Sequence, residues 1–311
     1  LSKDENPRHF LDGLDGPNLK SNGSGRLEWA RYVATDENPL TARVLVNRLW
    51  KHLFSNGIVT TVDSFGKMGF APSHPELLDY LATDFTDNDW SIKYMIRKMV
   101  LSSAYQMSST PSAIAQEADP KNQWLQHMPI KRLEAEYIRD HILACSETLD
   151  RTLYGPSVKA YVNDHPDSRA KPEEGPIDGD ARRSVYLELR RNFLPTFLRA
   201  FDMPNTTEPT GARHVTNVPA QSLALMNDPF VHQQAKIWAK RILESNLSLE
   251  DKIDSIHLSA LSRSATKQEK EWALRFLQAL SDEYKTTIDD VTIWTDLCHM
   301  IYNRKEFIYV F

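Results

Sequence analysis

Apolar residues recur at three- and four-residue intervals along most of the chain, which is the period of an amphipathic α-helix. The strongest pattern predicts a helix over residues 39–54. Asn38 is its expected N-cap, Pro39 its first helical residue, and Gly57 lies just past its end as a stop signal. Its apolar face consists of Ala42, Leu45, Val46, Leu49 and Leu53. This helix is therefore expected to cover a core.

Further helices follow from the same period and from their start signals. Ser73 and Glu76 have the spacing of a capping box, which predicts a helix over about 75–85. This helix and the one over 39–54 both carry wide apolar stripes, so we expect them to pack together with Trp50 largely buried between them. Other helices are expected over about 26–34, 91–100, 132–149 and 217–230, with three or four more over 230–310.

Only one segment has the alternating pattern of a strand. Between Ser184 and Leu189, the apolar residues Val185 and Leu187 alternate with polar neighbours. The predicted fold class is therefore mainly α, a helical domain with one minor β element. We expect a linker over residues 1–25, a helical half over 26–158, a polar loop over 159–181, and a strand with a helical half over 182–311. The two halves are expected to form one compact unit.

Composition excludes two classes of protein. The 311 residues include 37 Lys and Arg against 42 Asp and Glu, so the net charge is −5. A protein that binds nucleic acid through the phosphate backbone carries a basic excess instead. No apolar run approaches the roughly 20 residues that a membrane helix requires. We therefore expect neither a nucleic-acid partner nor a membrane span.

The two cysteines do not form a metal or haem motif. Cys145 and Cys298 each lie on the apolar face of a predicted helix, where a cysteine packs as a small hydrophobe. One disulfide is arithmetically possible. The sequence contains no C-x-x-C-H, and its ten histidines form neither H-x-x-x-H nor H-x-H. No metal site is predicted from local sequence.

Candidate chemistry centres on a histidine and on a group of arginines. His74 stands at a helix entrance near Asp79, where it can act as a general base or simply form a local hydrogen bond. The arginines of residues 182–213 have guanidinium groups that suit carboxylate, sulfate or phosphate groups. They are Arg182, Arg183, Arg190, Arg191, Arg199 and Arg213. Alternatively, they pair with acidic neighbours, which are Asp178, Asp180, Glu188, Asp202 and Glu208.

Two further expectations concern how these charges are arranged. The charged residues of 132–140 have i, i+3 and i, i+4 spacings, which favour ion pairs within one helix. They are Arg132, Glu134, Glu136, Arg139 and Asp140. Separately, we hypothesise that His74, Arg48, Arg183 and Arg190 converge on one polar site beneath the loop 159–181. The exposed N–H groups of a helix entrance favour an anion there.

Several ordered segments together resemble the domain of unknown function 1553 family, over about residues 24–309. Residues 38–50 read NPLTARVLVNRLW, residues 73–79 SHPELLD, and residues 132–140 RLEAEYIRD. Residues 182–187 read RRSVYL and residues 219–227 PAQSLALMN. The residues in these motifs that we single out are Asn47, Arg48, Trp50, His74, Asp79, Arg132, Glu136, Arg139, Asp140, Arg183, Gln221 and Asn227.

The resemblance implies a setting more than a reaction, because it supplies no catalytic residues. Members of this planctomycete-type family carry an upstream c-type cytochrome domain, so haem c is implied outside this segment. An exported, periplasmic or surface location and the degradation of complex, often sulfated, polysaccharides are also implied. Leu1 is not an initiator methionine, which suggests a piece of a longer protein. The expected partners are the cytochrome domain or another redox partner, and a carbohydrate ligand.

Three functions remain open at this point. The first is oxidative processing or binding of an acidic polysaccharide, with His74, Arg48 and Asp79 as candidate catalytic residues. Its candidate binding residues are Arg183, Arg190, Arg191, Arg213, Trp50, Asn47, Gln221 and Asn227. The second is a non-catalytic interaction, scaffold or glycan-binding module, which predicts an exposed apolar patch. The third is a hydrolase with two carboxylates across a cleft, drawn from Asp63, Asp79, Glu134 and Asp140.

Overall fold

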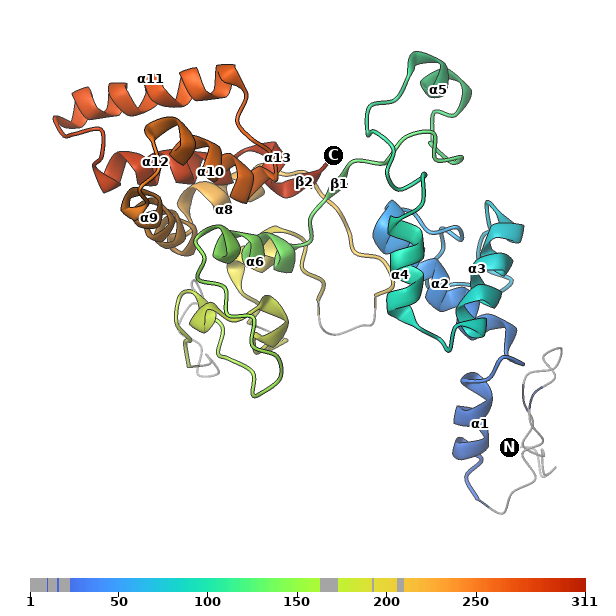
Figure 1. Cartoon of the computed structure of the whole chain (residues 1–311). Coiled ribbons are helices and arrows are strands. Elements are labelled where there is room, and N and C mark those ends of the chain that lie inside the picture. Colours follow the sequence, from blue (N-terminus) through green and yellow to red (C-terminus); the bar gives the residue numbers. More distant parts are fainter. Residues whose placement is uncertain (1–9, 11–15, 17–22, 163–172, 192, 206–209) are drawn as a thin grey trace. The chain divides into compact units, whose positions relative to one another are not determined.

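In a computed structural model, the chain divides into two compact units, Leu1–Pro129 and Ile130–Val310 (Figure 1). The structure describes residues 10, 16, 23–162, 173–191, 193–205 and 210–311. Each unit has its own hydrophobic core. The fold is mainly α, as expected.

Helix packing builds the first unit. Its helices are α1 (Arg26–Val33), α2 (Pro39–Phe54), α3 (Pro75–Asp87), α4 (Ile92–Val100) and α5 (Ala113–Ala118). The expected packing of α2 against α3 is confirmed, and α4 also packs against α2. Their apolar faces enclose a core that includes Val46, Phe54, Leu81, Phe85 and Met95.

The start and the end of α2 agree with the sequence pattern, whereas one of its aromatic residues differs from expectation. The Asn38 side chain accepts a hydrogen bond from Leu40 N at 2.9 Å, so the predicted N-cap is confirmed. The helix ends at Phe54, and the residue that follows, Ser55, is a non-glycine residue with φ 71°, two residues before Gly57. Trp50 is only half-buried, and it stacks on Phe54 with ring centroids 4.1 Å apart.

The capping box predicted at α3 is wrong. His74 occupies the N-cap position, and its side chain makes no capping hydrogen bond. Ser73 is instead bound to the loop that follows α2, because its backbone N–H and its Oγ both donate to Ile58 O, at 2.9 and 3.2 Å. Its hydroxyl is therefore not available to the first turn of α3.

The second unit is a larger helical assembly. Its main helices are α6 (Ala135–Cys145), α8 (Pro219–Asn227), α9 (Pro229–Glu244), α10 (Leu249–Leu261), α11 (Lys267–Tyr284) and α12 (Val291–Tyr302). Two short helices, α7 (Thr196–Ala200) and α13 (Lys305–Ile308), complete it. α12 packs along α9, and α11 packs against α12. The core between them includes Trp238, Leu277, Trp294 and Tyr302.

The minor β element is present, although not at the predicted strand. β1 (Lys131–Arg132) pairs antiparallel with β2 (Tyr309–Val310). The segment predicted as a strand contains the 3-10 turn η2 (Ser184–Tyr186), with one isolated bridge from Leu187 to Val158. The carboxylate of Asp140 holds this turn by accepting from both Ser184 N and Ser184 Oγ at 2.7 Å. The helix predicted over 132–149 is longer than the observed helix α6, because the beginning of that segment belongs to β1.

Both cysteines have the role that the sequence predicts. Cys145 on α6 and Cys298 on α12 are buried and free. Burial raises the pKa of both thiols well above their ordinary value. Each thiol therefore stays protonated and packs as part of the core. In the described part of the chain, no helix combines the length and the apolar character needed to cross a membrane.

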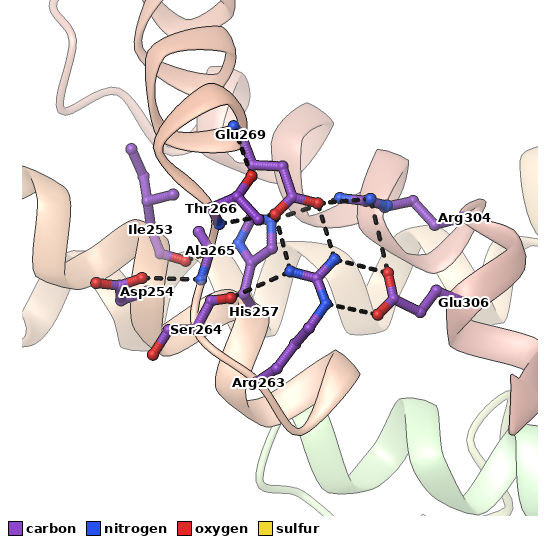
Figure 2. Close-up of polar contacts among 10 residues, drawn as sticks. All are labelled: Ile253, Asp254, His257, Arg263, Ser264, Ala265, Thr266, Glu269, Arg304 and Glu306. Carbon is purple, nitrogen blue, oxygen red and sulfur yellow. Dashed lines mark hydrogen bonds and ion pairs between the residues drawn. The ribbon is translucent and has the colours of Figure 1, made fainter. Parts of the chain in front are cut away.

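A four-residue charge network connects α10, α11 and α13 (Figure 2). Arg263 donates to Glu269 through two nitrogens at 2.8 Å and to Glu306 at 2.6 and 2.7 Å. Arg304 lies 2.7 Å from Glu269 and completes the network. Glu269 also belongs to a capping box with Thr266 at the start of α11. The two cations and two anions neutralise one another where the three helices meet.

Candidate binding site around Arg139

Arg139 is a buried cation within the second unit. It belongs to α6, where it lies in sequence between the core residues Ile138 and Ile142, and it is only 5% exposed. Its Nη1 donates to Arg182 O at 2.8 Å and to Ser184 Oγ at 3.0 Å, and its Nη2 donates to Asp178 O at 2.5 Å. These three acceptors are all uncharged. They position the guanidinium without neutralising it.

The charge on Arg139 is only partly balanced. Among the described residues, the carboxylate in contact with the guanidinium is that of Asp140, whose Oδ1 lies 3.6 Å from Nη1. Burial lowers the pKa of Arg139 to about 10, against the opposing attraction of Asp140 and Asp178. The group stays protonated at neutral pH, because that pKa is still far above 7. A buried cation in this state is stabilised by any further anionic partner.

A glycine allows the polypeptide to approach this guanidinium closely. Gly179 lies in the 3-10 turn η1 (Gly179–Ala181) with φ 58°. A Cβ at this position would lie 2.8 Å from Arg139 Nη2 and 2.7 Å from Leu187 Cδ2. Glycine therefore meets two requirements here, the left-handed backbone and the close contact.

Beside Arg139 lies a small pocket with mostly apolar walls. Its volume is about 30 Å³, enough for roughly two water molecules or one carboxylate-sized group. The aromatic rings of Tyr161, Phe197 and Phe230 line it, and the Phe230 ring centroid lies 5.6 Å from the Arg139 guanidinium carbon. The pocket therefore suits one charged group of a larger ligand.

One acidic side chain lines the same pocket. Asp228 is the N-cap of α9, and its Oδ1 accepts from Phe230 N at 2.9 Å. Burial raises the pKa of its carboxyl, and the neighbouring His232 opposes this shift. The ring centroid of His232 lies 4.1 Å from that of His299. The pocket thus has one cationic and one acidic side chain in its wall.

A second, smaller depression adjoins the pocket through Ala160, which lines both. Its walls contain two ion pairs. Arg190 Nε donates to Glu188 Oε1 at 2.7 Å, and Lys159 Nζ donates to Glu173 Oε2 at 2.5 Å. The predicted binding residue Arg190 is therefore near the pocket, and it pairs with a carboxylate that the sequence also suggested.

Three other predicted binding residues pair with partners on different elements. Arg213 makes a two-pronged contact with Glu136, at 2.6 and 3.0 Å, and Arg183 Nε lies 3.7 Å from Asp140 Oδ2. Both carboxylates belong to α6, so the expected ion pairs within that helix are replaced by tertiary ones. Gln221 is buried and donates to Thr216 O at 3.2 Å. These contacts hold segments of the second unit together.

A similar network surrounds Arg132, which belongs to β1 and not to a helix. Its Nη2 donates to Asp202 Oδ2 at 2.7 Å, and its Nη1 donates to Thr216 O at 2.6 Å. Asp202 also accepts from Thr216 N at 2.8 Å. Two other predicted binding residues are exposed: Arg191 and Asn227, the latter donating to Leu223 O of its own helix.

The remaining predicted site residues lie in the first unit. Asn47 is fully buried and holds the backbone of Val59 with two hydrogen bonds, a structural role. Arg48 is exposed on α2. His74 Nδ1 lies 2.9 Å from Ser73 Oγ, while Asp79 Oδ1 accepts from Arg43 Nε at 2.7 Å. Within the described residues, no contact joins the three predicted catalytic residues to one another.

The predicted convergent site combines residues of both units. His74 and Arg48 belong to the first, and Arg183 and Arg190 to the second. Their convergence therefore stays a prediction. Part of the loop expected to cover them, residues 163–172, lies outside the described residues. The described remainder of that loop supplies Ala160, Tyr161 and Gly179 to the pocket beside Arg139.

A family model described as "Protein of unknown function (DUF1553)" matches residues 25–277. The chain belongs to this family. The match covers most of both units, including every residue of the Arg139 pocket. No curated protein and no solved structure matches the sequence. The residues of this DUF1553 chain must therefore carry the functional argument themselves.

Haem c does not fit the residues of this DUF1553 chain. Covalent attachment needs the C-x-x-C-H motif, which the sequence lacks, and both cysteines are buried in separate helices. Among the residues that the structure describes, no cluster of three or more His, Cys, Asp or Glu side chains could hold a metal ion. A haem c outside this segment stays an expectation from the family resemblance.

Sequence reasoning assigned the two charged residues of the pocket, Arg139 and Asp228, to other roles. Arg139 was expected to pair within its helix, yet the apolar residues Ile142 and Leu143 follow it at i+3 and i+4, and that spacing was the available signal for burial. Asp228 falls near the end of the helix predicted over 217–230. The dipeptide Asp228-Pro229 is also a typical helix start, with an N-cap followed by proline.

Proposed function

We propose that the second unit of this DUF1553 chain is a binding module that captures the acidic group of a larger ligand at Arg139. The observation that carries the proposal is the buried, incompletely neutralised guanidinium in the wall of an aromatic pocket. A carboxylate or sulfate there gains charge-assisted hydrogen bonds in a site with little water. The pocket volume favours recognition of one group over enclosure of a whole ligand.

The ligand that we propose is an acidic polysaccharide, with a uronate or sulfate ester as the recognised group. Aromatic rings flank the guanidinium, and apolar faces of sugar rings pack on aromatic side chains. The adjoining depression, with its paired Arg190 and Lys159, offers charged groups of both signs to neighbouring hydroxyls. We further propose that the protein is exported and that it works beside a c-type cytochrome domain. In that setting, this chain would bind the polysaccharide.

Titration of the protein with single sugars tests the proposal. Glucuronate and glucose 6-sulfate are compared with glucose by calorimetry, and the arginine side-chain N–H signals are followed by NMR. We expect millimolar affinity for the two anions and a selective shift of the Arg139 signal. An affinity of 1 mM corresponds to about −4 kcal/mol, a reasonable value for one group.

Substitutions complete the test. Arg139→Lys keeps the charge but loses the planar fork, and it should weaken anion binding by roughly tenfold or more. Arg199→Lys, at an exposed position of α7, is the matched control and should leave binding unchanged. Equal binding of glucose and glucuronate, or an unmoved Arg139 signal, would refute the proposed function.

A specific observation also favours the second candidate, a protein-interaction module. Four apolar side chains on and before α8 are between 42% and 68% exposed: Val215, Val218, Leu223 and Met226. Apolar groups exposed together in this way are typical of interaction surfaces. Replacing Leu223 and Met226 with serine should abolish capture of a cytochrome-domain partner without changing anion binding.

A further inference from the structure

Two tyrosines and one ion pair form a cluster on the surface of the first unit, which we call the tyrosine cluster. On α3, Tyr80 and Asp84 are four residues apart, so they share one face of the helix. Tyr94 and Lys98 have the same spacing on α4. Lys98 Nζ donates to Asp84 Oδ1 and to Tyr80 Oη, both at 2.8 Å. Tyr94 Oη donates to Asp84 Oδ1 at 3.2 Å, so each tyrosine is held by a residue of the other helix.

Both rings remain accessible although their hydroxyl groups are fixed. Tyr80 is 56% exposed and Tyr94 is 36% exposed. The Lys98 ammonium lies 4.6 Å from the centroid of the Tyr80 ring and 5.9 Å from that of Tyr94, so one cation is near both rings. Aromatic side chains that are already fixed lose little conformational entropy when a ligand packs on them. The cluster is therefore a preorganised apolar surface.

The cluster also has hydrogen-bond donors that its own contacts do not use. Burial alone would lower the pKa of Lys98, but the hydrogen bonds to Asp84 and Tyr80 raise it above its ordinary value, so the ammonium keeps its three N–H donors at neutral pH. Among the described residues, Asp84 and Tyr80 accept two of these, which leaves one for a ligand. The Tyr80 hydroxyl accepts from Lys98 and keeps its own O–H to donate. Two donor groups therefore lie 2.8 Å apart beside the exposed rings.

The charge of the cluster indicates which kind of ligand fits. Asp84 balances the charge of Lys98, so the site has no net charge to attract an anion. Apolar ring faces beside a few hydrogen-bond donors suit a molecule with an apolar face and with hydroxyl oxygens along its edge. A pyranose ring has this character, because C–H groups lie on its faces and hydroxyl groups along its edge.

We propose that the tyrosine cluster binds an uncharged sugar residue, which packs its C–H face on the tyrosine rings and accepts hydrogen bonds from Lys98 and Tyr80. This site differs from the Arg139 pocket in the unit that carries it and in the charge of its ligand. It does not depend on anion binding at Arg139, so the two proposals can fail separately.

Four neutral tetrasaccharides test the proposal: cellotetraose, xylotetraose, mannotetraose and laminaritetraose. Each is titrated into the full chain labelled with fluorotyrosine, and the ring signals of Tyr80 and Tyr94 are followed by fluorine NMR. We expect at least one tetrasaccharide to bind with a Kd of about 1 mM and to shift these two signals selectively.

Substitutions assign the binding to the cluster. Tyr80→Ala and Tyr94→Ala should each weaken it roughly fivefold or more, because each removes an aromatic surface that the sugar contacts. Tyr137→Ala is the matched control, since Tyr137 is 58% exposed on α6 of the second unit, and it should leave the affinity unchanged. If an alanine variant does not fold, Tyr80→Phe keeps the ring and removes the hydroxyl donor, and it should weaken binding about threefold.

The outcomes separate this inference from the proposed function. Failure of all four tetrasaccharides to bind, or binding that leaves the signals of Tyr80 and Tyr94 unmoved, would overturn the inference. Variants of these tyrosines that fold and keep the wild-type affinity would overturn it as well. Arg139→Lys should weaken glucuronate binding and leave tetrasaccharide binding unchanged; an equal loss of both would move the sugar to the Arg139 pocket and contradict the role of the cluster.

Discussion

Removing Arg263 tests whether the charge network of α10, α11 and α13 stabilises the second unit. Arg263→Met keeps most of the aliphatic side chain and removes hydrogen bonds to both Glu269 and Glu306. Arg304 remains beside both carboxylates, at 2.7 and 3.7 Å. The variant therefore leaves two partly buried anions with one cation.

The expected loss lies between two limits. Exposed ion pairs contribute about 0.2–1 kcal/mol, whereas breaking a buried pair costs about 3–5 kcal/mol. The side chains of Arg263, Glu269 and Glu306 are 34%, 19% and 28% exposed, so solvent screens them only in part. We therefore expect a loss of about 2 kcal/mol in the free energy of unfolding. For a unit of this size, that lowers Tm by roughly 4–8 °C.

The pH dependence of the loss identifies its cause. The Arg263 side chain lowers the pKa of both Glu269 and Glu306 in the folded protein. Carboxylates with lowered pKa values stabilise the fold above their unfolded pKa of about 4.3, and that contribution is lost as the pH falls through the folded values. The difference between wild type and Arg263→Met should therefore be full at pH 7 and shrink steadily below about pH 4.

Calorimetry across this pH range measures the difference, and hydrogen exchange of α11 amides assigns the transition to the second unit. Arg275→Met is the matched control, because Arg275 is exposed on α11 and donates only to a backbone oxygen of its own helix. It should change stability by less than about 0.5 kcal/mol. A loss for Arg263→Met that is below this level, or equal at pH 7 and pH 3, would contradict the reasoning.

Two further predictions concern buried polar groups. Asn47→Ala removes both hydrogen bonds to Val59, so the Val59 amide should exchange much faster with solvent. The free energy of unfolding of the first unit should fall by about 3 kcal/mol. Arg48→Ala, at the exposed neighbouring position, is the control and should have neither effect. Burial raises the pKa of both Cys145 and Cys298. A thiol reagent at about pH 8 should therefore label them only in denaturant. Rapid labelling of the native protein would contradict the burial of these thiols.

The helices were predictable because apolar period is a local property. The pattern over residues 39–54 and the Asn38 cap both depend on neighbours within one or two turns, and both are confirmed. Failures occur where a distant group competes. Ser73 has the residue type of a cap, yet Ile58 O takes its hydroxyl. The apolar alternation of 184–189 suits a strand, but Asp140 fixes Ser184 in a turn.

The candidate site was less accessible to sequence reasoning than the fold. The arginine cluster drew attention to residues 182–190, of which Arg182 O and Ser184 Oγ accept hydrogen bonds from Arg139. Arg139 itself is 43 residues away from Arg182 in the chain, and helical spacing suggested only neighbours on α6. Tertiary contacts of this kind leave no periodic signal. A pocket assembled from α6, α7, α9 and the segments that precede α7 and α9 could therefore not be derived from spacing alone.

The short pair of β1 and β2 has a consequence for the chain's topology. Lys131 is opposite Val310 and Arg132 opposite Tyr309, so the two ends of the second unit are neighbours. A brief glycine-serine linker from residue 310 to residue 130, with new termini in the turn between α11 and α12, would give a circular permutant with the same contacts. In that permutant, the most distant pairing of the unit becomes a hairpin. In the natural order, β1 can pair with β2 only when a loop of nearly the whole unit closes, which costs chain entropy. The permutant avoids this cost, so a folding step that depends on the β1–β2 pairing should become faster.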